Sequence, residues 1–217
     1  MSTPNETITL RIPSKYASSS SSSSSSSFSH PPLEWLHRTW TVTHSTLAIW
    51  RTARNVRITY SPLPGDSSGR HRVDDLVQYE KTSGKGGVVK TVQGVDTSSA
   101  SAREGEGQGQ GSTASWDWRG KGLLGFVTSH WEVVGWGERD VGEAEGGGKE
   151  RWAVTWFAPT LFTKEGLDLY SDRKGGMSPA LAGDILAALK GLDAGPLVKM
   201  VEADMKEVEV RLPWLEG

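Results

Sequence analysis

The chain has 217 residues, and 24 Lys and Arg stand against 26 Asp and Glu, which gives a formal net charge of -2. This balance excludes the basic surface with which nucleic-acid-binding proteins neutralise phosphate, so we expect no nucleic acid as a partner. Cysteine is absent, which excludes disulfides, thiolate metal sites and cysteine nucleophiles. The 10 tryptophans outnumber the 4 phenylalanines and 4 tyrosines together.

The N-terminal region differs in composition from the rest of the chain. Residues 18–27 are all serine, a composition that cannot bury apolar surface. We expect residues 1–32 to form a disordered tail, although residues 7–12 alternate like a strand and would offer a sheet an extra edge. The first residues lack the apolar core of a secretory signal, and no run of about 18 apolar residues predicts a membrane span. We therefore expect a cytoplasmic protein.

The tryptophans outline the folded domain. They all lie after residue 34 and outside two polar, glycine-rich stretches, residues 97–115 and 140–149. Such stretches predict long solvated loops. We therefore expect a single domain over residues 33–217, with one core that the two flexible loops interrupt.

Within this domain the dominant period is two. Trp40, Val42 and His44 alternate with threonine and serine, which is typical of a strand with one face on a core and one in water. No helical crossover pattern separates consecutive strands, and this favours antiparallel neighbours. Eight such runs are separated by Gly, Pro, Asp or Ser turns: residues 39–45, 55–61, 72–80, 88–96, 116–120, 126–136, 151–158 and 167–171.

Helical spacing appears only near the C-terminus. Ser178-Pro179 is a helix start, apolar residues then recur every four positions, and Gly191 is a stop. A second start at Gly195-Pro196 leads to similar spacing, and residues 208–212 alternate like a last short strand. The order predicts an all-β, eight-stranded antiparallel up-and-down barrel with a C-terminal α-helical segment. A two-sheet sandwich is the alternative.

The first strand carries a family resemblance. Residues 36–42, Leu-His-Arg-Thr-Trp-Thr-Val, resemble the Gly-x-Trp signature of the calycin superfamily, the lipocalins and fatty-acid-binding proteins, with Arg38 in place of the glycine. The resemblance implies a calycin-like barrel in which Trp40 closes one end. Residues 43–51 and 55–60 also resemble small lipocalin-like proteins of filamentous fungi. Without a signal or cysteines, an intracellular variant is implied.

Two glycine-rich motifs point to turns. Residues 120–125 match G-x-G-x-x-G, but a strand pattern follows where a dinucleotide site needs a helix, so we predict a hairpin turn. Residues 83–87 lack the spacing of a phosphate-binding loop and also predict a turn. We expect no cofactor.

Three polar side chains are candidates for chemistry. His130 and Glu132 share one face of a strand, and we expect them to form an exposed pair on the outer face of the barrel. As alternatives, the pair lines a pocket or belongs to a metal site. We do not expect the metal site. Alternation places His44 with Trp40 on the inner face, either as a core histidine or as a ligand contact near its titration range.

The tryptophans suggest a binding role. Trp116 and Trp118 share one face of a strand, and Asp117 and Arg119 share the other; we expect the tryptophans inside, whereas an inward Arg119 would clamp a carboxylate. Our first hypothesis is a barrel that binds a small hydrophobic or aromatic molecule. Its ligand-binding residues are Trp40, His44, Tyr60, Trp118, Arg119, Trp131 and Trp156.

Two other hypotheses stay open. One is an isomerase or cyclase on the same barrel, in which His44 or Glu132 moves a proton. The other is a structural or interaction module whose barrel is solid.

Overall fold

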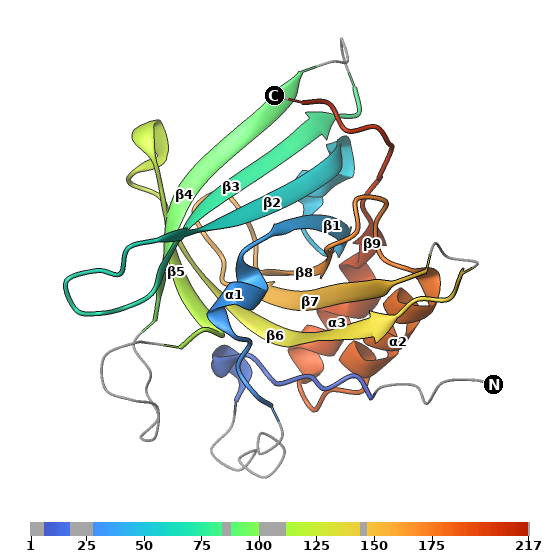
Figure 1. Ribbon diagram of the computed structural model, residues 1–217. Helices are drawn as coiled ribbons and strands as arrows, with labels where there is room; N and C mark the ends of the chain where they lie inside the picture. The colour runs from blue at the N-terminus through green and yellow to red at the C-terminus, as the bar shows by residue number, and fades with distance from the viewer. Residues whose placement is uncertain (1–6, 18–27, 84–87, 100–111, 144–146, 217) are drawn as a thin grey trace.

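Alternating apolar and polar residues fold into eight consecutive antiparallel strands in the computed structural model (Figure 1). The structure describes residues 7–17, 28–83, 88–99, 112–143 and 147–216. The strands are β1 (Thr39–Ser45), β2 (Ala53–Leu63), β3 (Arg72–Lys81), β4 (Val89–Ser98), β5 (Ser115–Gly120), β6 (Thr128–Asp140), β7 (Lys149–Phe157) and β8 (Gly166–Ser171).

The sheet closes on itself because β1 pairs antiparallel with both β8 and β2. Each other strand pairs with its neighbours in the chain, so the predicted eight-stranded up-and-down barrel is confirmed. The C-terminal helical segment is confirmed as α2 (Pro179–Lys190) and α3 (Gly195–Asp204). The alternation near the end of the chain gives the short strand β9 (Lys206–Glu207), which adds to β1.

Strands that alternate in direction place their connections at two ends of the barrel. The connections β1–β2, β3–β4, β5–β6 and β7–β8 lie at one end, which we call the loop end. It carries two 3₁₀ turns, η4 (Ala48–Thr52) and η5 (Gly122–Leu124). The residues that match G-x-G-x-x-G therefore form the β5–β6 turn. Residues 84–87, part of the other glycine-rich motif, lie outside the described residues.

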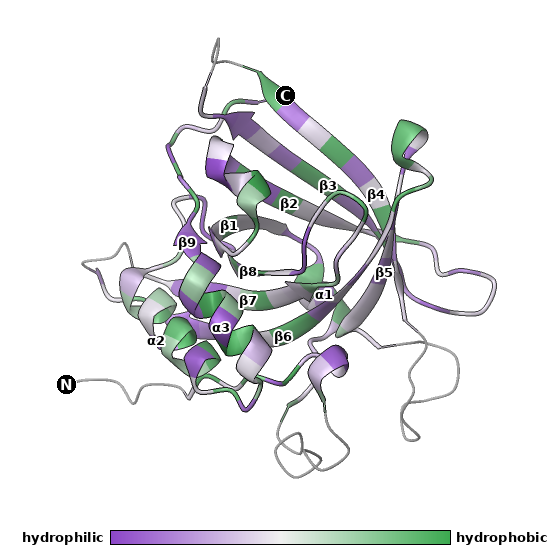
Figure 2. Cartoon of the chain, turned by 180° about the vertical axis from the view of Figure 1, so that it is seen from behind, coloured by the Kyte–Doolittle hydropathy of each residue, from purple (hydrophilic) through white to green (hydrophobic). Residues whose placement is uncertain are grey.

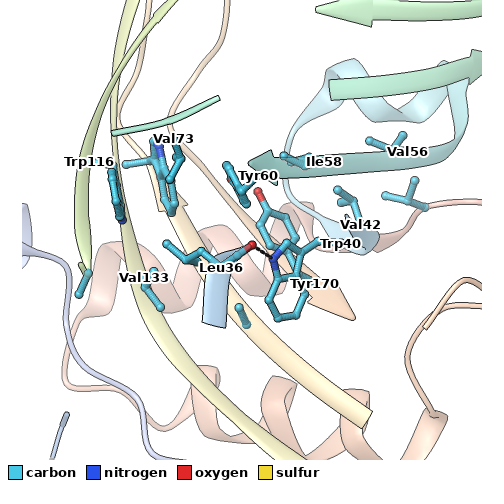
Figure 3. Close-up of a cluster of buried hydrophobic side chains, with 14 of the residues drawn as sticks. Leu36, Trp40, Val42, Val56, Ile58, Tyr60, Val73, Trp116, Val133 and Tyr170 are labelled. Atoms are coloured by element: carbon cyan, nitrogen blue, oxygen red, sulfur yellow. Dashed lines mark hydrogen bonds between the residues drawn. The ribbon is translucent and has the colours of Figure 1, made fainter. Parts of the chain in front are cut away.

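The opposite end is plugged by helix α1 (Leu33–Leu36) and Trp40. The Trp40 indole donates a hydrogen bond from Nε1 to the Leu36 carbonyl at 3.2 Å (Figure 3). The Arg38 guanidinium lies 5.3 Å from the Trp40 ring and 5.0 Å from the Trp35 ring. The arginine that replaces the signature glycine thus covers the closing tryptophan by cation–π contact.

A second core lies outside the barrel. Helices α2 and α3 pack on the outer face of β6, β7 and β8 (Figure 1), where they bury Val134, Trp152, Val154, Trp156, Leu167 and Leu169. These strands are therefore apolar on both faces, as strands covered on both sides must be.

The N-terminal segment also packs on the outer face. Leu10 forms a bridge with Gly135 of β6, and the Arg11 amide donates to the Val134 carbonyl at 2.8 Å. The turn η1 (Ser14–Tyr16) follows. Residues 7–17 thus depart from the expected disordered tail, because β6 offers them backbone partners and an apolar surface. The serine run at 18–27 lies outside the described residues, as do residues 100–111 and 144–146 of the two expected loops.

One glycine in β4 is required by a close approach. Trp118 lies directly over Gly94, so a Cβ at that position would collide with the indole and would sit 2.7 Å from the Arg119 carbonyl. We expect Gly94→Ala to lower the free energy of unfolding by about 1–3 kcal/mol, measured by urea denaturation.

The matched control is Gly183→Ala in α2, where no atom lies within 4 Å of the added Cβ. It should stabilise the protein by about 1 kcal/mol through helix propensity. Equal stability of Gly94→Ala and the wild type would contradict the close packing of Trp118.

Candidate functional site

Stacked aromatic rings fill part of the barrel lumen. Trp131 lies between Tyr60 and Trp116, with ring centroids 5.6 Å and 5.9 Å away and interplanar angles of 18° and 16°. The register explains the stack, because Trp116 is directly opposite Trp131 in the β5–β6 pair. Figure 3 shows Tyr60, Tyr170, Trp40 and Trp116 gathered in this core.

A layer of buried polar groups lies among these rings. It consists of Tyr60, Asp75, Asp96, Asp168 and Tyr170, and we call it the acid–tyrosine layer. Asp75 is directly opposite Tyr60 in the β2–β3 pair. Asp96 accepts a hydrogen bond from Trp131 Nε1 at 2.7 Å. Among the described residues, Asp75 Oδ1, Asp96 Oδ2 and the Tyr170 hydroxyl have no hydrogen-bond partner.

Burial shifts the ionisation of this layer. It raises the pKa of Asp75 to about 7, with the charge of Asp74 adding to the rise and a Trp118 hydrogen bond opposing it. Burial also raises the pKa of Asp96 well above its ordinary range, and Asp75 contributes to this. The pKa values of Tyr60 and Tyr170 rise for the same reason, so both phenols stay neutral. Low dielectric thus favours protonated acids that can donate hydrogen bonds.

Asp168 connects the layer to the loop end. Its carboxylate accepts hydrogen bonds from the Ser45 hydroxyl and from Trp50 Nε1, the latter at 3.4 Å. Burial raises the pKa of Asp168 to about 7, while Ser45, Trp50 and the positive charge of Arg51 act in the opposite direction. Turn η4, which carries Trp50, is thereby tied to β8 inside the barrel.

The apolar side chains in the half of the lumen nearer the loop end are not fully buried. Five aromatic or aliphatic residues pack against the barrel core there yet stay partly exposed. Trp50 and Tyr79 meet edge to face, with ring centroids 5.6 Å apart. We call this half of the lumen the mouth; it is lined by Trp50, Val77, Tyr79, Trp118 and Phe157.

The structure separates the sequence-predicted ligand residues into two groups. Trp40, Tyr60, Trp118 and Trp131 lie inside the barrel. Asp117 and Arg119 lie on the exposed outer face, as expected from the alternative with the tryptophans inside. Arg119 donates to the Gly125 carbonyl at 2.9 Å, so it lies too far out to clamp a carboxylate in the lumen.

The expected inward direction of His44 is corrected by a β-bulge. Val42 pairs with Tyr170, but the register then shifts, and His44 pairs with Leu169 on the outer face. A bulge adds one residue and reverses the inward–outward parity of everything after it. His44 is half-buried beside Glu207 of β9; burial lowers its pKa, and the charge of Glu207 opposes this.

Trp156 is also outside the lumen. Trp156 was expected among the ligand-binding residues, but it packs with Trp152 against the helices, and its Nε1 donates to Glu165 at 2.7 Å. The outer face of β7 is apolar because α2 and α3 cover it, so alternation alone gave the wrong face.

Glu132 and His130 form an outer pair, but Glu132 is buried rather than exposed. Arg11 Nη1 lies 2.7 Å from its carboxylate, and Ser14 donates to it from its amide at 3.1 Å and from its hydroxyl. His130 Nε2 lies 3.5 Å away and Nδ1 lies 2.8 Å from Asp117. Glu132 therefore anchors the N-terminal segment, and the structure does not bring it together with His44.

These contacts determine the ionisation of the pair. Burial would raise the pKa of Glu132, but hydrogen bonds from His130 and Ser14 and the charge of Arg11 outweigh it and lower the pKa to about 2. Hydrogen bonding to Glu132 and Asp117 raises the pKa of His130 against the effect of burial. No group of three or more His, Asp or Glu suited to a metal occurs among the described residues.

Sequence reasoning missed Asp75, Asp96, Asp168 and Tyr170. The signal for Asp168 was misleading, because Leu167 and Leu169 on either side of it look like the core-facing residues. Those leucines instead face α2 and α3. Asp75 and Asp96 could have been found from strand alternation, because an aspartate an even number of residues from an inward valine lies on the same inner face, as Asp75 does with Val73.

The fold and its contents define the class of this protein as a closed, eight-stranded up-and-down β-barrel that encloses aromatic rings and buried acids. Comparisons with solved structures find apocrustacyanin C1, at 9% identity and a TM-score of 0.45, over 82% of this chain and 78% of that one. They also find lobster apocrustacyanin A1, at 8% identity and a TM-score of 0.43, over 82% and 79%. No family model and no curated protein matches the sequence. In the part of the chain that the structure describes, no helix has the length and apolarity to cross a bilayer.

The raised pKa of Asp168 predicts a stability that falls with pH. The folded state keeps a proton up to about pH 7, whereas the unfolded chain loses it near 3.8, so stability falls as the pH rises between these values. Asp168→Asn removes this titration. Relative to wild type, its free energy of unfolding in urea should rise by up to about 4 kcal/mol between pH 4 and pH 8.

Asp140→Asn removes the same charge from an exposed position at the end of β6 and serves as control. A difference between Asp168→Asn and wild type that does not change with pH would contradict the buried, protonated state of Asp168.

The lowered pKa of Glu132 predicts the opposite dependence. The stability that ionised Glu132 contributes is fully present above its unfolded-state pKa near 4.5. It disappears as the pH falls toward the folded-state pKa of about 2. Glu132→Gln should therefore cost up to about 3 kcal/mol at pH 7 and progressively less in acid. It should also speed proteolysis within residues 7–17, measured by mass spectrometry, whereas the exposed-loop variant Glu143→Gln should not. Unchanged proteolysis would show that Glu132 does not anchor this segment.

Proposed function

We propose that the protein binds a small hydrophobic or aromatic molecule in the mouth of its barrel. The observation that carries this proposal is the combination of partly exposed inward aromatic residues with three unpartnered polar atoms beneath them. Small-molecule sites are typically apolar hollows with a few convergent polar groups.

The lining suits a flat or elongated apolar molecule. Trp50, Tyr79, Trp118 and Phe157 offer ring edges and faces, which favour aromatic or conjugated ligands. The five lining residues favour an apolar ligand body, and Lys90, which is paired with Tyr79 on the same face of the sheet, adds one exposed cation beside them.

The acid–tyrosine layer suits a polar group at one end of the ligand. An unpartnered buried polar atom costs about 1–3 kcal/mol, so a ligand hydroxyl, carbonyl or amine that pairs with it gains affinity. Protonated Asp75 or Asp96 can donate and the ionised form can accept, whereas the Tyr170 hydroxyl can do both. We also propose that the protein is related to the lipocalin-like proteins of filamentous fungi and that it acts inside the cell.

The catalytic alternative has no comparable support. His44 and Glu132 lie on the outer face of the barrel and on strands that are separated by β7 and β8. A proton donor or acceptor at either position would not reach a molecule in the lumen.

Binding is tested with the neutral probe N-phenyl-1-naphthylamine, whose emission rises in apolar sites and which accepts excitation energy from tryptophan. We expect saturable binding to the full chain. Val77→Trp places an indole in the mouth and should weaken binding at least about tenfold, the equivalent of 1.4 kcal/mol. The control Thr91→Trp adds the same ring on the outer face of β4, next to Gln78 of β3, and should leave binding unchanged.

Absence of probe binding, together with no co-purified small molecule in native mass spectrometry, would leave the solid-barrel module as the function. Equal binding by Val77→Trp and wild type would show that the probe occupies another surface.

A further inference from the structure

Exposed apolar side chains gather at the loop end of the barrel. Among the described residues, six of the seven exposed large apolar side chains belong to the four connections at this end: Ile49, Val88, Leu123, Phe126, Leu161 and Phe162. Scattered exposed apolar residues need no explanation, but a set confined to one end of a molecule marks an interaction surface.

Two of these connections carry the most exposed residues. In the β5–β6 turn, Leu123 is 94% exposed and Phe126 is 68% exposed; in the β7–β8 connection, Leu161 is 86% and Phe162 is 67% exposed. Figure 2 shows the β5–β6 turn as an apolar projection beyond the strands. Such side chains are costly in water unless a partner covers them.

A basic groove runs along the outer face of the barrel from the bases of these two connections to Arg70 and Arg72, which belong to the β2–β3 connection and the start of β3. It has a volume of about 610 Å³, and it runs from Gly120 and Lys121 of one connection to Ala158 and Pro159 of the other. Four cations line it, namely Arg70, Arg72, Arg119 and Lys121, together with His130 and a single carboxylate, Asp117.

Part of this positive charge is not neutralised by the protein. Lys121 pairs with Asp74 and Arg70 with Asp66. Arg72 and Arg119 have no carboxylate partner among the described residues, and the exposed Lys164 beside the apolar tip Phe162 has none either. Asp117 is engaged by His130.

We propose that the loop end docks on an anionic lipid bilayer. Leu123, Phe126, Leu161 and Phe162 would enter the interfacial region, and Arg119 and Lys164 would meet lipid phosphates. Apolar tips flanked by unneutralised cations match the two attractive forces of an anionic membrane surface, apolar burial and charge attraction. A protein partner would need a matching apolar surface with acidic groups, whereas a bilayer offers both to any set of projecting tips. The surface does not depend on the contents of the barrel.

The proposal is tested by sedimentation of the full chain with vesicles of phosphatidylcholine alone or mixed with phosphatidylserine. We expect binding to the mixed vesicles that falls with added salt and with removal of phosphatidylserine. Leu123→Ser and Phe162→Ser should each lower the partition coefficient about tenfold. Arg119→Gln combined with Lys164→Gln should lower it about fivefold per charge and reduce the salt dependence.

The chain offers a matched control for the apolar tips. Leu212 is 53% exposed but belongs to none of the four connections. Its neighbours Arg211 and Leu215 are held by Asn55 of β2 and Glu80 of β3, so Leu212→Ser should bind vesicles like the wild type. Val77→Trp, which blocks the mouth, should also keep vesicle binding, and this separates the surface from the ligand site. Circular dichroism melting verifies that each variant is folded.

Failure of the wild type to sediment with either vesicle, or equal sedimentation of the Leu123→Ser and Leu212→Ser variants, would overturn the proposal. So would concentration-dependent self-association that Leu123→Ser abolishes, because the tips would then cover a second copy of the chain.

Discussion

Closure of the sheet through β1 is the constraint on which the rest of this structure depends. Since β1 pairs with both β8 and β2, every main strand has one face in the lumen and one face outside. An eight-stranded lumen is filled by its own side chains or has room for one small ligand. Trp40, Trp116, Trp118 and Trp131 take much of that space, whereas Trp152 and Trp156 lie outside it.

The outer face of β6 to β8 accommodates these two tryptophans. Helices α2 and α3 and residues 7–17 cover it, which creates a second apolar core around Trp152 and Trp156 and a buried ion pair between Arg11 and Glu132. The two cores share strands that are apolar on both sides. This explains how polar Asp168 can face the lumen while its leucine neighbours face the helices. The acid–tyrosine layer is therefore as much a result of the helices as of the barrel.

Several features follow directly from local pattern. Eight runs of period two, turn residues between them and two helical segments with Pro starts were enough to predict the barrel and its C-terminal helices. The pairing of Trp116 with Trp118 and of Asp117 with Arg119 on opposite faces was also correct. The docking of residues 7–17 was not predictable in this way, because Leu10 and Arg11 are held by β6, which is more than a hundred residues away in the chain.

The sequence by itself determined which residues share a face of each strand, because side chains alternate along extended backbone whatever surrounds them. It did not determine which face is inside. That choice depended on long-range packing: the bulge after Val42 moved His44 outside, and the helices over β7 made Trp156 an outer residue. The gathering of Asp75, Asp96 and Asp168 around Tyr60 and Tyr170 likewise exists only once the barrel closes. Groups from β3, β4 and β8 become neighbours only through that closure.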